Sequence, residues 1–236
     1  MRKKIFLLLT ISLLLAQCSM LHALNYIDIP TVRTEEKGKF GLRFRVFDQG
    51  SLLTRWTVGI NRFITLGVPF EVENFIGQGE LEADFPIMVM ARTKIEPSSA
   101  YLPLIGFGYD PVKYGQLNLA GEKVERGGYI VFGCREKSVA GIKYYLSAGF
   151  SAPLRDYEPE GIITFGGFKV AFNENLSFLA EIDQVYFSAK DREKAKYNAG
   201  FKYKIIPNLS FTFGLRELTQ NRPERIISIN YQGVLF

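Results

Sequence analysis

Glu181 and Asp183 are the two residues whose type and spacing best fit catalytic chemistry. They stand two positions apart in a segment that alternates apolar and polar residues, so both side chains are expected on one face of a β-strand. Paired carboxylates on one face can act as general acid and general base. They can equally form salt bridges with the basic residues Lys169, Lys202 and Lys204 of neighbouring strands, and this structural role is the one we expect.

The rest of the sequence lacks the usual catalytic and metal-binding combinations. The sole histidine, His22, lies in the leader described below, and Cys134 is a lone thiol on an alternating segment. A Ser-His-Asp triad, a Cys-His pair and histidine-containing zinc sites are therefore excluded for the processed chain. Glycine pairs such as Gly77 and Gly79 lack the strand-to-helix context of a phosphate-binding loop. We expect no enzymatic activity, no metal and no cofactor.

Residues 1–23 have the organisation of a secretory signal peptide. Three consecutive basic residues, 2–4, precede the uncharged apolar run 5–16, and small or polar residues lead to Ala23, after which we expect cleavage. Cys18 leaves open a lipid anchor at its thiol instead. Cleavage removes three basic residues and no acidic one, so the formal net charge falls from +5 to about +2. Because the basicity belongs mostly to the export signal, no nucleic-acid partner is expected.

From residue 38 onward the dominant sequence period is two. Apolar and aromatic residues occupy one face of each segment and small, polar or charged residues the other, as with Phe40 and Leu42 against Gly41 and Arg43. The segments that we predict to be strands are 38–47, 51–60, 62–70, 83–95, 100–109, 128–136, 141–151, 161–172, 176–187, 195–205, 209–218 and 225–236.

The lengths of these segments and of their connections favour a membrane barrel. A soluble β-sandwich shows the same alternation, but most segments approach the 9–11 residues that cross a bilayer at a tilt. Even-numbered connections are short and odd-numbered ones mostly long and polar, except for the tight first hairpin at 48–50. We predict an all-β fold, an antiparallel up-and-down transmembrane β-barrel of about 12 strands over residues 38–236, preceded by a periplasmic segment, 24–37.

The C-terminal strand carries a further signal. It contains Tyr231 and ends in Phe236, and outer-membrane barrels generally present such an aromatic end to their assembly machinery. Phe236 and Tyr231 are out of phase with each other. We therefore expect a bulge at Gln232–Gly233, where the glycine favours one.

Three motifs resemble those of the YjbH-like outer-membrane proteins, a group associated with exopolysaccharide production. They are IDIPT at residues 27–31, PLIGFGYD at 103–110 and GYIVF at 128–132. The stretch 111–115 reads PVKYG and departs from the clean Gly-Thr-Gly of the pattern. The resemblance implies an outer-membrane barrel with an envelope or exopolysaccharide role, and it transfers no catalytic residue.

The alternation also predicts which charged residues line the lumen. Bases outnumber acids there, so an open lumen would favour anions, including acidic sugars. A barrel of this size can instead fill its interior with charge-paired side chains and conduct nothing. The expected lumen residues are Arg43, Arg45, Arg55, Lys143, Lys169, Glu181, Asp183, Lys202, Lys204 and Arg216.

Three functions remain compatible with the sequence. The first is a non-enzymatic barrel exported to the bacterial outer membrane, with a structural or exopolysaccharide-associated accessory role. The second is a narrow anion-preferring outer-membrane channel, and the third is a secreted soluble or lipid-anchored β-sandwich that acts as a binding module. For the first two, the expected partners are outer-membrane lipid and the outer-membrane assembly machinery, joined by polysaccharide through the resemblance.

Overall fold

A computed structural model of the chain describes residues 26–47, 50–83, 88–99, 101–113, 116–117, 123–139, 141–154, 162–186, 195–219 and 222–235. Within these residues, no helix is long and apolar enough to cross a membrane. The predicted signal peptide, Cys18 and Phe236 lie outside the described residues.

Twelve strands of six residues or more form the barrel within the described part of the chain. They are β1 (Lys39–Phe47), β2 (Ser51–Gly59), β3 (Ile64–Glu73), β5 (Met90–Ile95), β6 (Leu104–Asp110), β9 (Gly127–Gly133), β11 (Ile142–Ala152), β12 (Ile163–Ala171), β13 (Leu176–Tyr186), β14 (Lys196–Ile206), β15 (Leu209–Arg216) and β16 (Glu224–Val234). Shorter strands lie in the connections: β4 (Glu82–Ala83), β7 (Gln116–Leu117), β8 (Lys123–Val124) and β10 (Lys137–Val139).

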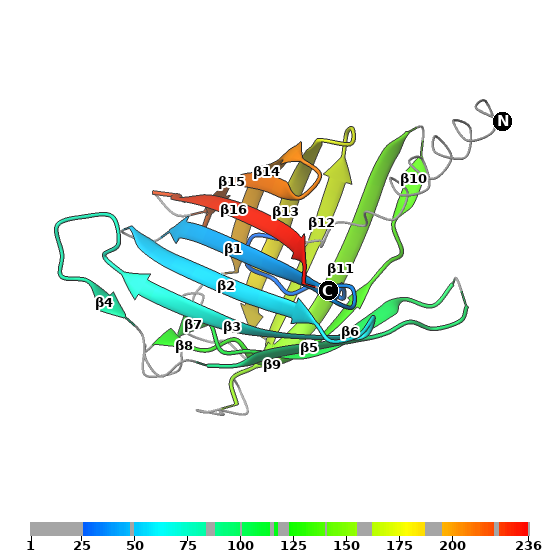
Figure 1. Ribbon diagram of the computed structural model, residues 1–236, viewed down its shortest axis with the longest axis horizontal. Coiled ribbons are helices and arrows are strands. Elements are labelled where there is room, and N and C mark those ends of the chain that lie inside the picture. The colour runs from blue at the N-terminus through cyan, green and yellow to red at the C-terminus, as the bar shows by residue number, and fades with distance from the viewer. Residues whose placement is uncertain are drawn as a thin grey trace.

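The sheet closes on itself, because its last strand pairs with its first. β16 runs antiparallel to β1 from Lys39 opposite Val234 to Val46 opposite Ile227, and each of the other long strands pairs antiparallel with its sequence neighbours. Figure 1 shows the red β16 lying beside the blue β1. The predicted up-and-down barrel of 12 strands is confirmed, and the β-sandwich alternative is wrong because there is one closed sheet rather than two stacked ones.

The alternation of side chains sets the two faces of this sheet. On β2, Trp56 is 61% exposed on the outside while its neighbour Arg55 is buried inside. On β14, Phe201 is exposed and Lys202 is buried. Large apolar side chains therefore form a continuous outer surface, of the kind that a lipid bilayer covers.

Strand ends differ from the prediction where the local sequence interrupts pairing. The expected strand 83–95 is paired with β6 only from Ala91, within β5. The expected bulge at Gln232–Gly233 is absent, because β16 keeps a regular register with β1 as far as Val234. Tyr231 lies on the outer face at 38% exposure. A register shift that the sequence analysis did not predict occurs instead between β12 and β13, beside Gln184, whose φ is 56°.

The two ends of the barrel differ in their connections. We call the end with residues 60–63, 172–175 and 207–208 the short-turn end, because these short segments join consecutive long strands there. Asn61 and Asn173 each accept two backbone N–H bonds through the side-chain oxygen, which closes their turns. The opposite end carries longer connections, such as 111–126 between β6 and β9, and we call it the long-loop end.

Candidate functional site

The interior of the barrel is occupied by the chain that precedes β1. Tyr26, Ile27, Ile29 and Val32 are all buried, at 4% exposure or less, and they contact the inner wall of the sheet. We expected residues 24–37 on the periplasmic side of the barrel. Instead, residues 26–35 lie inside, and we call them the lumen segment; in Figure 1 they form the blue trace among the strands.

Apolar burial supplies one physical reason for this placement. Tyr26, Ile29 and Val32 form one core cluster with inward-facing side chains of β6, β9, β11, β12 and β13, including Val131 and Phe165. A second cluster joins Ile27 to Phe47 on β1, Leu53 on β2, Ile226 on β16 and Val112 in the β6–β9 connection. The apolar residues of the segment thus fill space in which water would otherwise contact the apolar side chains of the inner wall.

Glycines on the inner wall give the lumen segment its room. A Cβ placed on Gly167 would stand 2.6 Å from Ile29 Cδ1 and 3.1 Å from Tyr26 Cε1. A Cβ on Gly214 would stand 3.0 Å from Ile27 Cδ1. The wall and the segment are therefore fitted to each other, and a larger side chain at Gly167 would collide with the segment.

Glu181 anchors the bend of the lumen segment. Its carboxylate accepts hydrogen bonds from the backbone N–H groups of Ile27 at 3.1 Å, Asp28 at 2.9 Å and Ile29 at 3.4 Å. Asn198 on β14 donates to the same carboxylate at 2.6 Å. Successive backbone N–H groups that converge on one anion form a concave anion-binding nest, and here the bound anion belongs to β13.

Asp28 adds two buried ion pairs to this anchor. Its carboxylate lies 2.8 Å from Arg45 Nη1 on β1 and 2.7 Å from Arg216 Nε on β15, and all three side chains are at most 4% exposed. Burial alone would raise the pKa of Asp28, but the guanidinium groups of Arg216 and Arg45 lower that pKa below its ordinary value. Asp28 is therefore charged at neutral pH and ties two strands to the segment.

At the long-loop end, residues on either side of the connection between β6 and β9 form buried ion pairs. Arg126 is wholly buried, pairs with Asp183 on β13, and lies 5.6 Å above the Phe165 ring. Arg55 on β2 pairs with Asp110 at the end of β6, at 2.8 Å. Asp110 and Arg126 stand at the two ends of the connection, so these pairs link both ends to the barrel wall. The buried charges of the two pairs are thus compensated by opposite charges.

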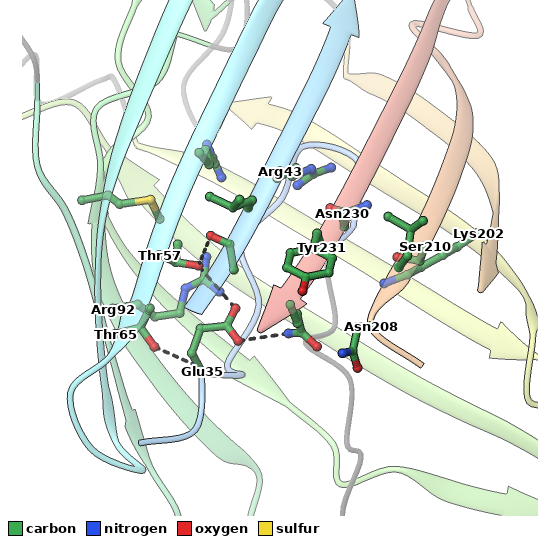
Figure 2. Close-up of a pocket in the computed structure, with 16 residues that line it drawn as sticks. Glu35, Arg43, Thr57, Thr65, Arg92, Lys202, Asn208, Ser210, Asn230 and Tyr231 are labelled. Atoms are coloured by element: carbon green, nitrogen blue, oxygen red, sulfur yellow. Dashed lines mark hydrogen bonds between the residues drawn. The ribbon is translucent and has the colours of Figure 1, made fainter. Parts of the chain in front are cut away.

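A small cavity lined by several basic side chains remains near the short-turn end, and we call it the basic pocket. It has a volume of about 50 Å³. Figure 2 shows Glu35 entering it from the lumen segment, with Arg43, Arg92 and Lys202 approaching from the barrel wall. Neutral polar side chains also line it, namely Thr57, Thr65, Asn208, Ser210, Asn230 and Gln232, together with Arg55 and apolar residues such as Leu42 and Met90.

Hydrogen bonds hold Glu35 in the basic pocket. Its carboxylate accepts from Gln232 Nε2 at 3.0 Å and from Thr57 Oγ1 at 3.5 Å, and its backbone N–H donates to Thr65 Oγ1 at 2.7 Å. Burial raises the pKa of the Glu35 carboxyl above its ordinary value, although the nearby Arg92 acts in the opposite direction. The lumen segment thus has a polar anchor at each end.

The structure places the predicted lumen residues on the expected face, with one of them at the rim. Lys143 lies at the start of β11 with 60% of its side chain exposed, 3.8 Å from Glu136. The others lie on the inner face of their strands: Arg43, Arg45, Arg55, Lys169, Glu181, Asp183, Lys202, Lys204 and Arg216.

The partners of the two carboxylates differ from those that the sequence suggested. Glu181 binds the backbone of the lumen segment, and Asp183 pairs with Arg126; no described ion pair joins either to Lys169, Lys202 or Lys204. Sequence reasoning missed the partners because Arg126 and the segment lie outside the predicted strands. One signal was present in the sequence: Asp28 stands between two isoleucines in a segment that we predicted to be periplasmic, and isoleucine is usually buried.

The candidate site is therefore the filled lumen of the barrel. Among the described residues, no group of histidine, cysteine, aspartate and glutamate side chains has an arrangement that could hold a metal ion. The lumen contains buried ion pairs, hydrogen bonds to the backbone of the lumen segment, and basic side chains that can interact with anions.

Comparison with known proteins adds information on the fold. No protein-family model matches the chain, and no curated protein matches it either. Among solved structures, the KdgM porin is similar with a TM-score of 0.52 at 10% sequence identity, over 82% of this chain and 98% of that one. The Acinetobacter baumannii outer membrane protein Omp33 has a TM-score of 0.48 at 9% identity, over 84% and 97% of the two chains. At such identity, the likeness to the KdgM porin shows a porin-like barrel fold and nothing about the ligand.

Proposed function

We propose that the protein is a non-enzymatic barrel of the bacterial outer membrane, closed by its own lumen segment, with a structural and envelope-associated role. The observation that carries this proposal is the double attachment of the segment inside the barrel. The Glu181 carboxylate binds the backbone of residues 27–29, and Asp28 pairs with both Arg45 and Arg216. A barrel built only to conduct has no evident need for buried charges that hold a plug.

Location in the outer membrane is supported by the surface and by the loops. The outer face carries exposed side chains such as Trp56, Phe201 and Ile229, which are costly to leave in water. A closed sheet has no free edges and satisfies its backbone groups internally, as a bilayer requires. The short connections 60–63, 172–175 and 207–208 lie at the end that also holds the start of β1 and the end of β16, in the pattern of periplasmic turns, and the short connection between β1 and β2 is the exception at the other end.

An exopolysaccharide association is the finer part of the proposal, and it rests on the resemblance to YjbH-like proteins. The residues that carry the resemblance meet around the lumen segment. A Cβ on Gly106 would stand 3.0 Å from Val32 Cα, and one on Gly108 would stand 2.3 Å from the Tyr129 hydroxyl. The shared motifs therefore coincide with the contacts that seat the plug, which supports a shared architecture.

An anion-preferring channel is the second candidate, and the basic pocket favours it. Arg43, Arg92 and Lys202 line the pocket, and Glu35 is the acidic side chain in its lining. If the lumen segment leaves the barrel, these bases and Lys169 line the vacated path. Anions would then pass more readily than cations.

A disulfide lock tests whether the segment closes the barrel. A Cβ on Gly214 lies 3.5 Å from Ile27 Cγ1, and in a disulfide the matching Cβ to Sγ separation is about 3.0 Å, given an S–S bond of about 2.04 Å. We expect Ile27→Cys combined with Gly214→Cys, in a Cys134→Ser background, to form this bridge on oxidation.

Conductance in planar bilayers gives the readout. The unmodified protein should show rare openings, oxidation of the double-cysteine variant should abolish them, and reduction should restore them. The two single-cysteine variants control for the substitutions themselves. Steady conductance that oxidation leaves unchanged would show that the segment does not close the barrel.

The location and the envelope role need separate measurements. Cell fractionation should find the protein with outer-membrane markers, and its gel migration should change on heating, as closed barrels do in detergent. Loss of the gene should reduce extracellular polysaccharide, and the wild-type gene should restore it. Recovery of the protein in the soluble fraction would refute the outer-membrane location. An unchanged amount of extracellular polysaccharide would refute only the exopolysaccharide association.

A further inference from the structure

The outer face of the barrel carries a groove over β9, β11, β12, β13 and β14. It has a volume of about 790 Å³, within the range of about 300–1,000 Å³ that is typical of sites for a small organic molecule. Its floor consists of small residues in neighbouring positions of the sheet. Ala148 lies opposite Gly166, and Ala180 lies in the next row, opposite Phe168. A Cβ added to Gly166 would meet its nearest neighbour only at 3.6 Å, so the floor is open to a ligand.

Large apolar side chains border this floor. Phe132, Leu146, Phe168 and Tyr197 are all exposed on the outer face and line the groove. The lining continues at the short-turn end with Tyr101, Leu102 and Pro103, in the connection between β5 and β6. A groove with an apolar border, on the face that a bilayer covers, fits the acyl chain of a lipid.

Two basic side chains, Arg135 and Lys137, line the groove at the same end. They belong to the connection between β9 and β11, within which β10 pairs with β11 (Figure 1). Lys137 is directly opposite Tyr144 in this pairing, and directly opposed residues share a face of the sheet. Tyr144 shares the outer face with Leu146, because alternate residues of a strand point the same way. The exposed Lys137 therefore lies on the lipid side of the barrel, where its long stem allows the ammonium group to reach the lipid headgroups.

Hydrogen bonds fix Arg135 at the end of the groove. Its Nη1 donates to Glu96 Oε1 at 3.0 Å, and its Nη2 donates to the Pro97 carbonyl at 2.6 Å. These bonds join the β9–β11 connection to the β5–β6 connection, which contributes Tyr101 and Leu102 to the lining. The basic end of the groove and its apolar border are thus held together.

The charge at this end of the groove is positive. The two connections contain two acidic residues, Glu96 and Glu136, and each lies within 4.0 Å of two bases. The basic residues in or next to the connections outnumber them, namely Lys94, Arg135, Lys137 and Lys143. Basic side chains near a membrane surface attract anionic lipids. An apolar groove with a cationic end is therefore complementary to a lipid that joins an acyl chain to an anionic headgroup.

We propose that this groove binds one phospholipid with an anionic headgroup, of the phosphatidylglycerol class. An acyl chain lies over Ala148, Gly166 and Ala180, and the phosphate contacts Lys137 and Arg135. The headgroup sets the preference among lipids, because the tails of all of them are similarly apolar. The inference rests on the outer-membrane location proposed above, and it holds whether or not the lumen segment closes the barrel.

Native mass spectrometry of the full protein tests the site, after lipid is removed in detergent and defined lipids are added. We expect one phosphatidylglycerol to bind more tightly than phosphatidylethanolamine with the same acyl chains. Lys137→Gln should weaken the binding of phosphatidylglycerol about fivefold, the usual contribution of one basic residue near lipid headgroups. Lys37→Gln is the matched control, because Lys37 is an exposed lysine before β1 and does not line the groove.

Ala148→Phe obstructs the acyl chain instead of the headgroup. Phenylalanine keeps the outer surface apolar but occupies the floor of the groove, so the tightly bound phosphatidylglycerol should be lost. Ala91→Phe is its control, because Ala91 lies opposite the exposed Leu66 on the outer face and outside the groove. Heat-dependent gel migration of each variant shows that the barrel is folded, so loss of the lipid is separated from loss of the fold.

Weaker binding in Lys137→Gln and Ala148→Phe, with both controls unchanged, supports the lipid site. Equal binding of the two lipids by the unmodified protein, or equal effects of Lys137→Gln and Lys37→Gln, would overturn it. A dimer that Ala148→Phe disrupts would assign the groove to a second copy of the chain and would also overturn the lipid site. Failure of the outer-membrane location is a separate result, because it appears as soluble protein on cell fractionation.

Discussion

Arg45 Nη1 on β1 lies 2.8 Å from Asp28 Oδ1, and both side chains are almost completely buried inside the barrel. The two residues are 17 positions apart in a chain that must turn back between them, so the ion pair fixes the lumen segment against the strand that follows it. Arg43, two residues earlier on the same face, donates to the carbonyls of Tyr26 and Ile27. The segment therefore runs alongside β1, from Glu35 beside Gly41 to Asp28 beside Arg45.

Removal of the Asp28 carboxylate should destabilise the barrel markedly. Asp28→Ala leaves Arg45 buried without this partner, while Arg216 keeps Glu224 at 2.9 Å. Loss of one partner of a buried pair typically costs about 3–5 kcal/mol. Urea unfolding in detergent should show this loss, together with easier proteolysis near residue 28. Glu36→Gln is the control, because its ion pair with Lys39 is half exposed and is worth about 1 kcal/mol or less. Equal stability of the two variants would contradict the assignment.

The contribution of Asp28 should depend on pH in a defined direction. Because its pKa in the folded protein lies below the ordinary value, the ion pairs contribute fully above pH 4 to 5 and are lost as the pH falls through the folded pKa. The stability difference between the unmodified protein and Asp28→Asn should therefore be constant from pH 6 to 8 and shrink below about pH 4. Unfolding measured across this range gives the check, and a difference that widens on acidification would refute it.

Glu35 should show the reverse dependence. Its folded pKa is raised by burial, so the folded protein takes up a proton more readily than the unfolded chain does. Glu35 therefore contributes to folding stability below the ordinary glutamate pKa, and this contribution disappears as the pH rises through the pKa of Glu35 in the folded protein. Relative to Glu35→Gln, the unmodified protein should therefore gain stability as the pH falls from 7 to 4. Parallel unfolding curves for the two proteins at all pH values would argue against a buried Glu35.

Two neighbouring glycines on β12 offer a test of the packing between wall and segment. Gly167 faces inward, where an added Cβ meets Ile29 at 2.6 Å. Gly166 faces outward, where an added Cβ has only ordinary contacts, at 3.6 Å or more. Gly167→Val should therefore expel or distort the lumen segment and increase bilayer conductance, whereas Gly166→Val should do neither. Similar conductance of the two variants would show that the segment is not seated on β12.

The sequence predicts the wall of this barrel better than its contents. Alternation assigns Arg45, Glu181 and Arg216 to the inner face, and all three are buried in the structure. This assignment needs no distant contacts, because a period of two is a local property that each strand displays by itself. The position of Asp28 depends on contacts with residues more than 150 positions away, such as Glu181, and no local pattern encodes them. The same limit applies to Arg126, whose partner Asp183 lies 57 residues further along.

Glu181→Gln should loosen the bend of the lumen segment while the barrel stays intact. A carboxylate presents two acceptor oxygens to the converging N–H groups of Ile27, Asp28 and Ile29. Glutamine keeps one acceptor and turns an NH₂ donor toward other donors, so part of the nest loses its anion. Hydrogen exchange at the amides of residues 27–29 should accelerate about tenfold or more, as expected for the loss of charge-assisted bonds. Ser177→Ala, a buried change on the same face of β13, should leave that exchange unaltered. If exchange at residues 27–29 is equally slow in Glu181→Gln, the negative charge of Glu181 is not what holds the segment, and the ion pairs of Asp28 with Arg45 and Arg216 must hold it without that charge.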